Sequence, residues 1–486
     1  MNTGLTTAFK LFRKAASKVP AYKAFLKRQH VRADQIKSPN DFTTLPLMDK
    51  KNYLHRYQYR DLFVSGKIPP MAYASSGSSG KPTFWFRGDE QEQIGGDIHE
   101  KIFKKIFRIK KNEPTLVVIC FSMGLWIAGN YTAAACRFLA RKGYLLTVIT
   151  PGIEKTDVFN TLKDLAPHYK NIVLAGYPPF LMDMINDCKT QKISLNRKLK
   201  ILTAGDKFSE AWRQAIFELV GIRDYYHSLV SIYGSADAGV LGFETPLSIF
   251  LRKTALTNKS LYRDLFGTET VLPALVQYDP QNIFFEQAEG ELVFTTATSA
   301  PLIRYNIHDL GRIITYEQIK ALLIKYHLLK AGKPLGLKDW KLPFVVKTER
   351  TDVAVTFYAL NIFPEHILAG IKDQKVSKFL SGNFFAYNKQ LHHNKVQKLY
   401  LKLELAEGLK KLNEKNMSLI RDTVLRYLIA LNMEFRKLFS AIGEKALPVV
   451  YFSRFHDKKF ATSGTNGILN IQGKKPKILK SRPIKT

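Results

Sequence analysis

The sequence predicts an α/β protein in which a large N-terminal domain is followed by a small α+β domain. Between about residues 70 and 290, short β-branched runs alternate with stretches of helix length, which is typical of layered α/β sheets. From Gly290 the pattern changes to strands alone, and after about Lys347 it follows the β-α-β-β-α-β order of a ferredoxin-like arrangement. We therefore predict a large domain over 1–347, with a β-rich subdomain, and a small ferredoxin-like domain over 348–486.

The individual elements follow from the same patterns. Before residue 65 the chain reads as helices interrupted by prolines. The predicted strands of the layered sheets are 115–122, 144–150, 171–175, 200–203 and 229–233, and those of the β-rich subdomain are 291–296, 302–305 and 312–316. In the small domain we expect strands at 353–363, 379–387, 398–405 and 448–452, and helices at 364–371 and 412–439.

The balance of charge is strongly basic, because 74 Lys and Arg residues oppose 41 Asp and Glu, for a net charge of +33. Such an excess attracts polyanions, including nucleotides and acidic proteins, although a solvated basic surface is an equally good interpretation. The basic residues are spread over the whole chain, which argues against a nucleic-acid binder.

The cysteines favour a reducing compartment, and one uncharged stretch raises the question of a membrane span. Cys120, Cys136 and Cys188 show no paired spacing, so neither a disulfide framework nor a zinc site is indicated, and a cytoplasmic protein is expected. Residues 116–136 contain no charge and are long enough to cross a bilayer. A break at Gly124 divides them into a buried strand and a helix, so no transmembrane segment is predicted.

A loop rich in serine and glycine supplies the first chemical signal. Its amides and hydroxyls can surround a phosphate chain, although the spacing is not that of a Walker loop and a plain linker is the alternative. The loop residues are Ser75, Ser76, Gly77, Ser78, Ser79, Gly80 and Lys81.

Two strand ends in the middle of the chain supply the second signal. The run Tyr233-Gly234-Ser235-Ala236-Asp237 offers backbone to a flat base and a carboxylate to a hard cation such as Mg²⁺. An ordinary strand-to-loop turn is the alternative. Upstream, a second strand ends in a turn of small residues, which continues as Gly205, Asp206 and Lys207.

The third and fourth signals lie on either side of the predicted domain boundary. Asp309 follows the run PLIRYNIH, where a carboxylate can accept both hydroxyls of a ribose; a salt bridge to Arg304 or Arg312 is the alternative. Arg350 and Asp352 belong to the run TERTD at the change of pattern.

Together these four segments resemble the adenylate-forming superfamily, and most closely its phenylacetate–CoA ligase-like branch. The motifs of that branch run SSGTTGKPT, YGxxE, GELVFTT…PLIRYRTGDL and GRxDD…NVFP, and this chain has SSGSSGKPT, YGSAD, GELVFTT…PLIRYNIHDL and ERTD…NIFP. The segments 19–22 and 45–50 are similar to the branch's opening helices, so the resemblance extends over nearly the whole chain.

The resemblance implies a role for each matching residue. The serine/glycine loop would hold the ATP phosphates, residues 205–207 and 233–235 would enclose adenine, and Asp237 would take the place of a Mg²⁺-linked glutamate. Asp309 and Arg350 would bind the ribose, and Asp352 would be the hinge of the small domain. The acyl pocket is expected at Trp126, Gly129 and Tyr177.

The resemblance also implies a catalytic lysine near the C-terminus, where a cation neutralises the charges that crowd together in the transition state. We assign this role to Lys474, with Lys475 and Lys477 as rivals in the same lysine-rich segment. Ala359 stands where the family has a glycine beside the thiol's path, and this leaves the acceptor open.

The expected function is ATP-dependent conversion of an aryl or fatty carboxylic acid to its acyl-AMP, followed by transfer to a thiol. The expected cofactors are ATP, Mg²⁺ and CoA. An acidic acyl carrier protein is the alternative acceptor, and it would suit the charge of +33. A non-catalytic nucleotide-binding protein that keeps the fold is the rival from another class.

Overall fold

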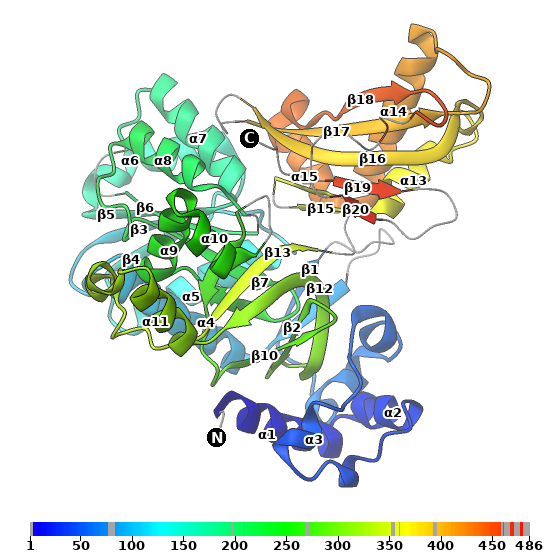
Figure 1. The fold of residues 1–486 in the computed structure, drawn as a ribbon. Helices are drawn as coiled ribbons and strands as arrows, with labels where there is room; N and C mark the ends of the chain where they lie inside the picture. The colour runs from blue at the N-terminus through cyan, green and yellow to red at the C-terminus, as the bar shows by residue number, and fades with distance from the viewer. Residues whose placement is uncertain are drawn as a thin grey trace.

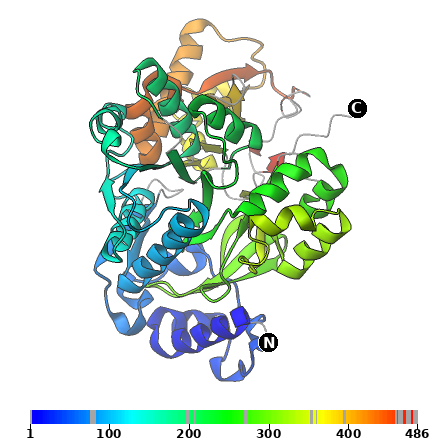
Figure 2. The ribbon, with the colours of Figure 1, turned by 90° about the vertical axis from the view of Figure 1, so that its left-hand side faces the viewer.

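The computed structural model describes residues 3–75, 83–195, 199–205, 207–267, 272–350, 355–358, 360–391, 396–457, 460, 467–470 and 477–479. Within this part of the chain a large α/β body lies between two smaller units. The N-terminal helices lie at one end and the C-terminal α+β unit lies at the other (Figures 1 and 2). The α/β class and the division into a large and a small domain are therefore as predicted.

An 11-stranded sheet runs through the large body in the order β10-β11-β12-β13-β9-β8-β7-β6-β5-β3-β4. Its strands are β3 (Thr115–Cys120), β4 (Leu146–Ile149), β5 (Asn171–Gly176), β6 (Leu199–Ala204), β7 (Leu229–Ser235), β8 (Gly239–Phe243), β9 (Ala274–Gln277), β10 (Ile283–Ala288), β11 (Glu291–Thr296), β12 (Leu302–Ile314) and β13 (Phe344–Arg350). Strands β4, β3, β5, β6 and β7 are parallel, and the pairings from β7 to β10 are antiparallel.

Helices cover both faces of the parallel half, which explains why β3 is buried along its whole length. Leu116 and Val118 of β3 pack with α6, α7 and α8, whereas Val117 and Ile119 pack with α4 and α5. This division follows from the alternation of side chains along a strand. The helices of the large body as a whole are α4 (Asp89–Lys101), α5 (Ile127–Arg141), α6 (Lys155–Asp164), α7 (Pro178–Thr190), α8 (Glu210–Val220), α9 (Pro246–Thr257), α10 (Lys259–Phe266), α11 (Tyr316–Lys325) and α12 (Leu329–Gly332).

The uncharged stretch divides as the sequence predicts, into β3 and α5 on either side of Gly124. Among the described residues, no helix has both the length and the apolar character that a membrane span requires.

Strand β12 differs from the prediction, because the two short strands expected at 302–305 and 312–316 form one strand of 13 residues. Its first half pairs with β11 and its second half with β13. Gly311 makes the second pairing possible, since a Cβ at this position would lie 2.2 Å from the carbonyl oxygen of Val346. Tyr316, which we expected at the end of a strand, begins α11 instead, after a cap in which Thr315 accepts from Gln318 N.

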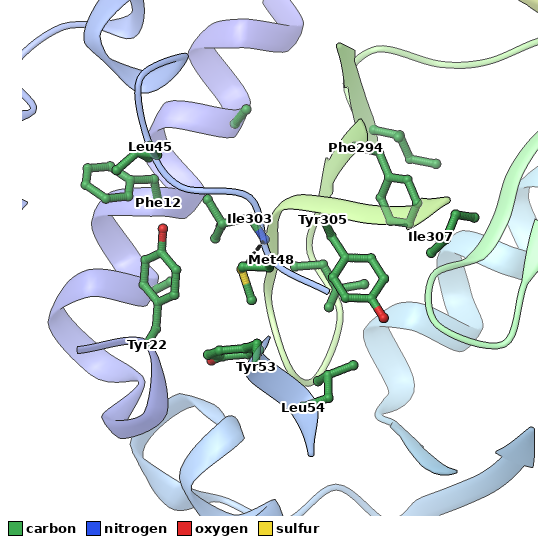
Figure 3. Packing of buried hydrophobic residues seen from close by; sticks show 14 of the residues in the cluster. Phe12, Tyr22, Leu45, Met48, Tyr53, Leu54, Phe294, Ile303, Tyr305 and Ile307 are labelled. Carbon is green, nitrogen blue, oxygen red and sulfur yellow. Dashed lines mark hydrogen bonds between the residues drawn. The ribbon is translucent and has the colours of Figure 1, made fainter. Parts of the chain in front are cut away.

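The N-terminal helices are α1 (Thr3–Lys18), α2 (Pro20–Arg28) and α3 (Pro39–Phe42), and they share one hydrophobic core with β10, β11 and β12. Figure 3 shows Phe12 and Tyr22 on the helical side of this core and Phe294 and Tyr305 on the sheet side. Met48 joins the two sides, because its N–H donates to the carbonyl of Arg304 at 3.0 Å and its carbonyl accepts from Asn306 N at 2.8 Å. The segment that follows Met48 is thereby fixed against β12.

The small domain has its own hydrophobic core, built from residues between 355 and 450. Its elements are β14 (Val355–Phe357), β15 (Leu360–Ile362), α13 (Pro364–Ile371), β16 (Leu380–Leu391), β17 (Val396–Leu405), α14 (Glu414–Leu431), α15 (Met433–Ile442), β18 (Val449–Ser453), β19 (Gly467–Asn470) and β20 (Lys477–Leu479). The sheet order is β18-β17-β16-β19-β20, and β14 and β15 form a separate two-stranded sheet.

Two details of the small domain differ from the prediction. The first strand of the ferredoxin-like order does not join the main sheet, because β14 and β15 pair with each other. The single helix expected over 412–439 is divided at Asn432, whose side chain accepts from Phe435 N at 2.9 Å and caps α15. An asparagine that caps a new helix competes with continuation of the previous one.

A buried ionic network joins α8 to β7 and α9 in the large domain. Arg213, which is fully buried, donates to Glu210 and Glu244 and to the carbonyl of Leu229, and Arg252 contacts both carboxylates. Charges this deep are tolerated because each one has partners.

We therefore expect Arg213→Ala to lower the free energy of unfolding of the large domain by about 3–5 kcal/mol, because two buried carboxylates lose a cation. Denaturant titration followed by circular dichroism measures this. Gln214→Ala, on the exposed face of the same helix, is the matched control and should change stability by less than about 0.5 kcal/mol. Equal effects of the two substitutions would contradict the structural role of the network.

Candidate active site

The predicted site residues of the large domain gather where the parallel strands end. Trp126 precedes α5, Tyr177 follows β5, Gly205 follows β6, and Tyr233 and Gly234 lie in the last residues of β7. The carboxyl ends of parallel strands form the ligand-binding edge of such sheets. The structure thus brings the predicted pocket and adenine residues to one edge.

Two tyrosine–aspartate hydrogen bonds cross between β7 and β12 at this edge. The Tyr233 hydroxyl donates to Asp309 Oδ2 at 2.6 Å, and the Tyr305 hydroxyl donates to Asp237 Oδ2 at 2.7 Å. Each tyrosine is followed four residues later by an aspartate: Asp309 lies in β12 itself, and Asp237 lies in the turn after β7. Asp309 and Asp237 are 2% and 3% exposed, so the phenols satisfy carboxylates that would be costly to bury alone.

Lysines complete the surroundings of the two carboxylates. Lys347 Nζ lies 3.8 Å from Asp309 Oδ1 and 6.0 Å from the centre of the Tyr233 ring. Lys50 Nζ lies 3.4 Å from Asp237 Oδ1. Each buried aspartate thus has a phenol at one oxygen and an ammonium group near the other.

Asp309 and Arg350, the predicted ribose pair, face each other in the register of β12 and β13. The backbone turns just before Asp309, where His308 has a φ of 64° and its N–H donates to Asn306 Oδ1 at 2.7 Å. A register shift follows between Asp309 and Gly311. Such a bulge redirects a side chain at the point where regular pairing stops.

Further contacts involve the turn after β6 and the end of β7. Lys207 Nζ donates to the carbonyl of Thr348, which joins the turn after β6 to β13. In β7, Ser235 Oγ accepts from Ala238 N at 3.1 Å and closes the turn before β8. The turn at 205–207, the end of β7 and the strand of Arg350 therefore lie together.

The β-hairpin that carries the serine/glycine loop is attached to the turn of Asp237. The loop connects β1 (Met71–Ser75) to β2 (Thr83–Arg87), and Ser75 Oγ accepts from Trp85 Nε1 at 2.9 Å. Arg87, at the far end of β2, donates to the carbonyls of Ala236 and Asp237 at 2.6 and 3.0 Å. The strand that leaves the loop is therefore attached to the turn that carries Asp237.

Several predicted residues lie outside the described part of the chain. They are Ser76, Gly77, Ser78, Ser79, Gly80, Lys81, Asp206, Asp352, Ala359 and Lys474. Their roles stay predictions, as does the role of the Arg350 side chain.

The predicted acyl-pocket residues follow β3 and β5 at the same edge of the sheet. Tyr177 and Phe121 pack edge to face with ring centres 5.0 Å apart. Trp126 forms a bridge with Ala74 of β1, so it lies beside the strand that enters the loop. Gly129 permits a close approach, because a Cβ there would lie 2.8 Å from the carbonyl oxygen of Ser122.

Sequence reasoning missed Lys50, Lys347, Arg87 and Tyr305. Lys50 belongs to a segment that we matched only to the opening helices, and it reaches Asp237 because Met48 pairs with β12. Lys50 Nζ also lies 5.3 Å from the centre of the Trp85 ring. The Y-x-x-x-D spacing, which occurs at Tyr233–Asp237 and again at Tyr305–Asp309, was a usable signal for Tyr305.

Asp237 suits Mg²⁺ as one ligand among several. Mg²⁺ is usually held by one or two carboxylates together with the phosphates of a nucleotide. The described residues include no group of three or more His, Cys, Asp or Glu side chains arranged to hold a metal, so no all-protein site is present among them. Asp237 would hold such an ion together with a bound nucleotide, at the position where Lys50 now neutralises it.

Two curated proteins and a solved structure are similar to this chain. The phenylacetate-coenzyme A ligase of Aromatoleum evansii is 24% identical over 307 residues, which are 62% of this chain and 64% of that protein. The Pseudomonas putida enzyme of the same name is 22% identical over 308 residues, which are 62% of this chain and 63% of that protein. The chain thus matches just under two thirds of the length of either relative. No family model matches the sequence.

Among solved structures, a 2-hydroxyisobutyryl-CoA ligase in complex with 2-HIB-AMP and CoA has a TM-score of 0.60 and 15% identity. The match covers 93% of this chain and 85% of that one. The fold is therefore that of the adenylate-forming ligases. In sequence, the chain is similar to the phenylacetate-coenzyme A ligases, to which the four motifs also point.

The crossed bonds lead to a stability prediction. We expect Tyr305→Phe and Tyr233→Phe each to lower the free energy of unfolding by about 1–3 kcal/mol, because each removes the phenol that donates to a buried carboxylate. Denaturant titration measures both. The control is Tyr326→Phe, which removes a phenol from Asp264, a carboxylate with 31% side-chain exposure, and should cost less than about 0.5 kcal/mol. A loss in the control as large as in the other two would show that burial does not decide the effect.

Proposed function

We propose that this protein activates a carboxylic acid with ATP, forming acyl-AMP and pyrophosphate, and then transfers the acyl group to a thiol. The observation that supports this best is the meeting of three motifs, far apart in the sequence, around Asp237 and Asp309, together with the attachment of the β1–β2 hairpin to the turn of Asp237. A buried carboxylate opposite the strand of Arg350 suits a ribose, and the loop that starts at Ser75 suits phosphates. Relatives named as phenylacetate-coenzyme A ligases support the same reaction class.

The proposed roles divide between binding and charge neutralisation. Asp309 and Arg350 bind the ribose hydroxyls, and the loop 75–81 binds the phosphates. Lys50 lies next to Asp237 and near the Trp85 ring of β2, so we add it to the groups that meet the phosphates. Lys474 is the proposed cation at the reacting carboxylate. Mg²⁺, when bound at Asp237, supplies further charge neutralisation.

CoA is the preferred acceptor, and an acidic acyl carrier protein is the second candidate. Structural support for CoA comes from the 2-hydroxyisobutyryl-CoA ligase, which was captured with CoA and an acyl-adenylate. The charge of +33 favours a carrier, because complementary charge speeds encounter.

We propose that residues 1–347 bind ATP and the acid, and that residues 348–486 reorient about Asp352 between the two steps. The three described cysteines are all free thiols, which suits the reducing cytoplasm.

The deciding experiment measures pyrophosphate release with a panel of aryl and fatty acids, with CoA and an acyl carrier protein offered separately. We expect release with at least one acid, and thioester formation with CoA. Thioester on the carrier alone would establish the second candidate. Absence of pyrophosphate release with every acid, alongside measurable ATP binding, would establish a non-catalytic nucleotide-binding protein.

Asp309→Ala tests the ribose role. Loss of a charged hydrogen bond costs on the order of 1.5–3 kcal/mol, so ATP affinity should fall roughly ten- to hundredfold. Isothermal titration calorimetry measures the affinity, and circular dichroism checks the fold. Lys325→Ala removes an exposed lysine that pairs with Asp264, and it should leave ATP affinity unchanged. Unchanged affinity in a folded Asp309→Ala protein would remove Asp309 from the site.

A further inference from the structure

An ionic contact joins the small domain to the large one at Asp183 in α7. Lys155, the first residue of α6, donates to Asp183 Oδ2, and Lys445 donates to Asp183 Oδ1 at 2.8 Å. Lys445 lies in the short 3₁₀ helix Gly443–Ala446 of the small domain. Strand β17 also lies against α7. In Figure 1, α7 lies beyond the left-hand end of the small domain's sheet. A single carboxylate is thus shared by lysines from two domains.

The two lysines that contact Asp183 differ in the exposure of their side chains and in their other contacts. The side chains of Asp183, Lys155 and Lys445 are 10%, 19% and 48% exposed. Lys155 also contacts Asp187 Oδ2 at 2.7 Å, so its position does not depend on the small domain. When Lys445 leaves, Asp183 keeps Lys155 and is not left as an unpaired buried charge. The contact with Lys445 is therefore reversible.

Asp183 is ionised, which the contact requires. Burial alone raises the pKa of Asp183, but the hydrogen bonds from Lys155 and Lys445 hold this pKa below its ordinary value. The small domain presents its side of the contact rigidly. Lys398 Nζ of β17 donates to the carbonyls of Glu444 and Lys445 at 3.4 and 3.3 Å, which fixes the turn that carries Lys445.

Asp183 is also connected to the predicted acyl pocket. Helix α7 begins directly after Tyr177, so the helix that meets the small domain starts at a pocket residue. On the other side of the contact, burial and, to a smaller extent, the charge of Asp183 raise the pKa of Tyr358 in the small domain. The backbone N–H of Tyr358 donates to Gln397 Oε1 at 2.7 Å, at the start of β17.

We propose that Asp183 is a positioning residue that holds Lys445, and through it the small domain, in one of the two orientations that the reaction uses. This inference rests on the proposed function for the existence of a second orientation. Lys445 releases and re-forms the contact in each cycle, while Lys155 keeps the carboxylate in place.

Fluorescence energy transfer between the domains tests the contact without reference to activity. The native cysteines are buried, and burial raises the pKa of Cys136 and Cys188 to about 12, so maleimide dyes attach to introduced thiols. Leu256→Cys and Leu419→Cys provide exposed positions in the large and small domains. We expect Lys445→Glu to reduce, about threefold or more, the population of molecules that show the energy-transfer efficiency of the wild type. Lys445→Arg should preserve this population. Lys411→Ala, at an exposed lysine elsewhere in the small domain, should change nothing.

Measurement of the two half-reactions on the same variants tests the positioning role. The ratio of acyl-AMP formation to thioester formation from preformed acyl-AMP should change about threefold or more in Lys445→Glu and recover in Lys445→Arg. Unchanged energy transfer in Lys445→Glu would overturn the contact. A changed transfer population with an unchanged ratio would overturn the positioning role. If the wild type releases no pyrophosphate with any acid, the proposed function fails, while the transfer experiment still decides whether the contact orients the domains.

Discussion

The crossed hydrogen bonds between β7 and β12 are the constraint on which the candidate site depends. Tyr233 reaches from β7 to Asp309, and Tyr305 reaches back from β12 to Asp237. Because both carboxylates are buried and each needs its phenol, the two strands are held in one relative position. Strand β12 also pairs with Met48 and β13, so the N-terminal segment and the strand of Arg350 take their places from the same element.

The protein contains two kinds of shared carboxylate, and their partners differ in kind. Asp237 and Asp309 accept from phenols of strands β12 and β7 in the same sheet, so these contacts lie entirely within the large domain. Asp183 accepts from two ammonium groups, one of which belongs to the other domain. An ion pair with a half-exposed lysine can exchange with water at low cost. The permanent contacts therefore lie within the large domain, and the exchangeable one lies between the domains.

Most of the element types could be predicted from the sequence, because strands buried on both faces and amphipathic helices have clear patterns. Tyr233 and Gly205 could be placed at strand ends for the same reason, whereas Asp309 lies within the antiparallel strand β12 and its proposed role came from the resemblance of its motif to the family's. The contact between Lys50 and Asp237 could not be predicted, because it depends on the pairing of Met48 with Tyr305 of β12, two residues that lie far apart in the sequence. Local competition explains the other differences: Asn432 caps a new helix, and Gly311 lets β12 continue beside β13.

The position of Trp85 has an optical consequence. The chain contains four tryptophans, of which Trp212 and Trp340 lie in hydrophobic cores beneath the helices. Trp85 donates to Ser75 at the mouth of the loop and has the Lys50 ammonium group near its ring, and Trp126 bridges to the neighbouring strand. If a nucleotide binds beside Lys50 as proposed, it changes the electric field at the Trp85 indole. The emission of the unmodified protein therefore reports on this edge of the sheet, with no dye attached.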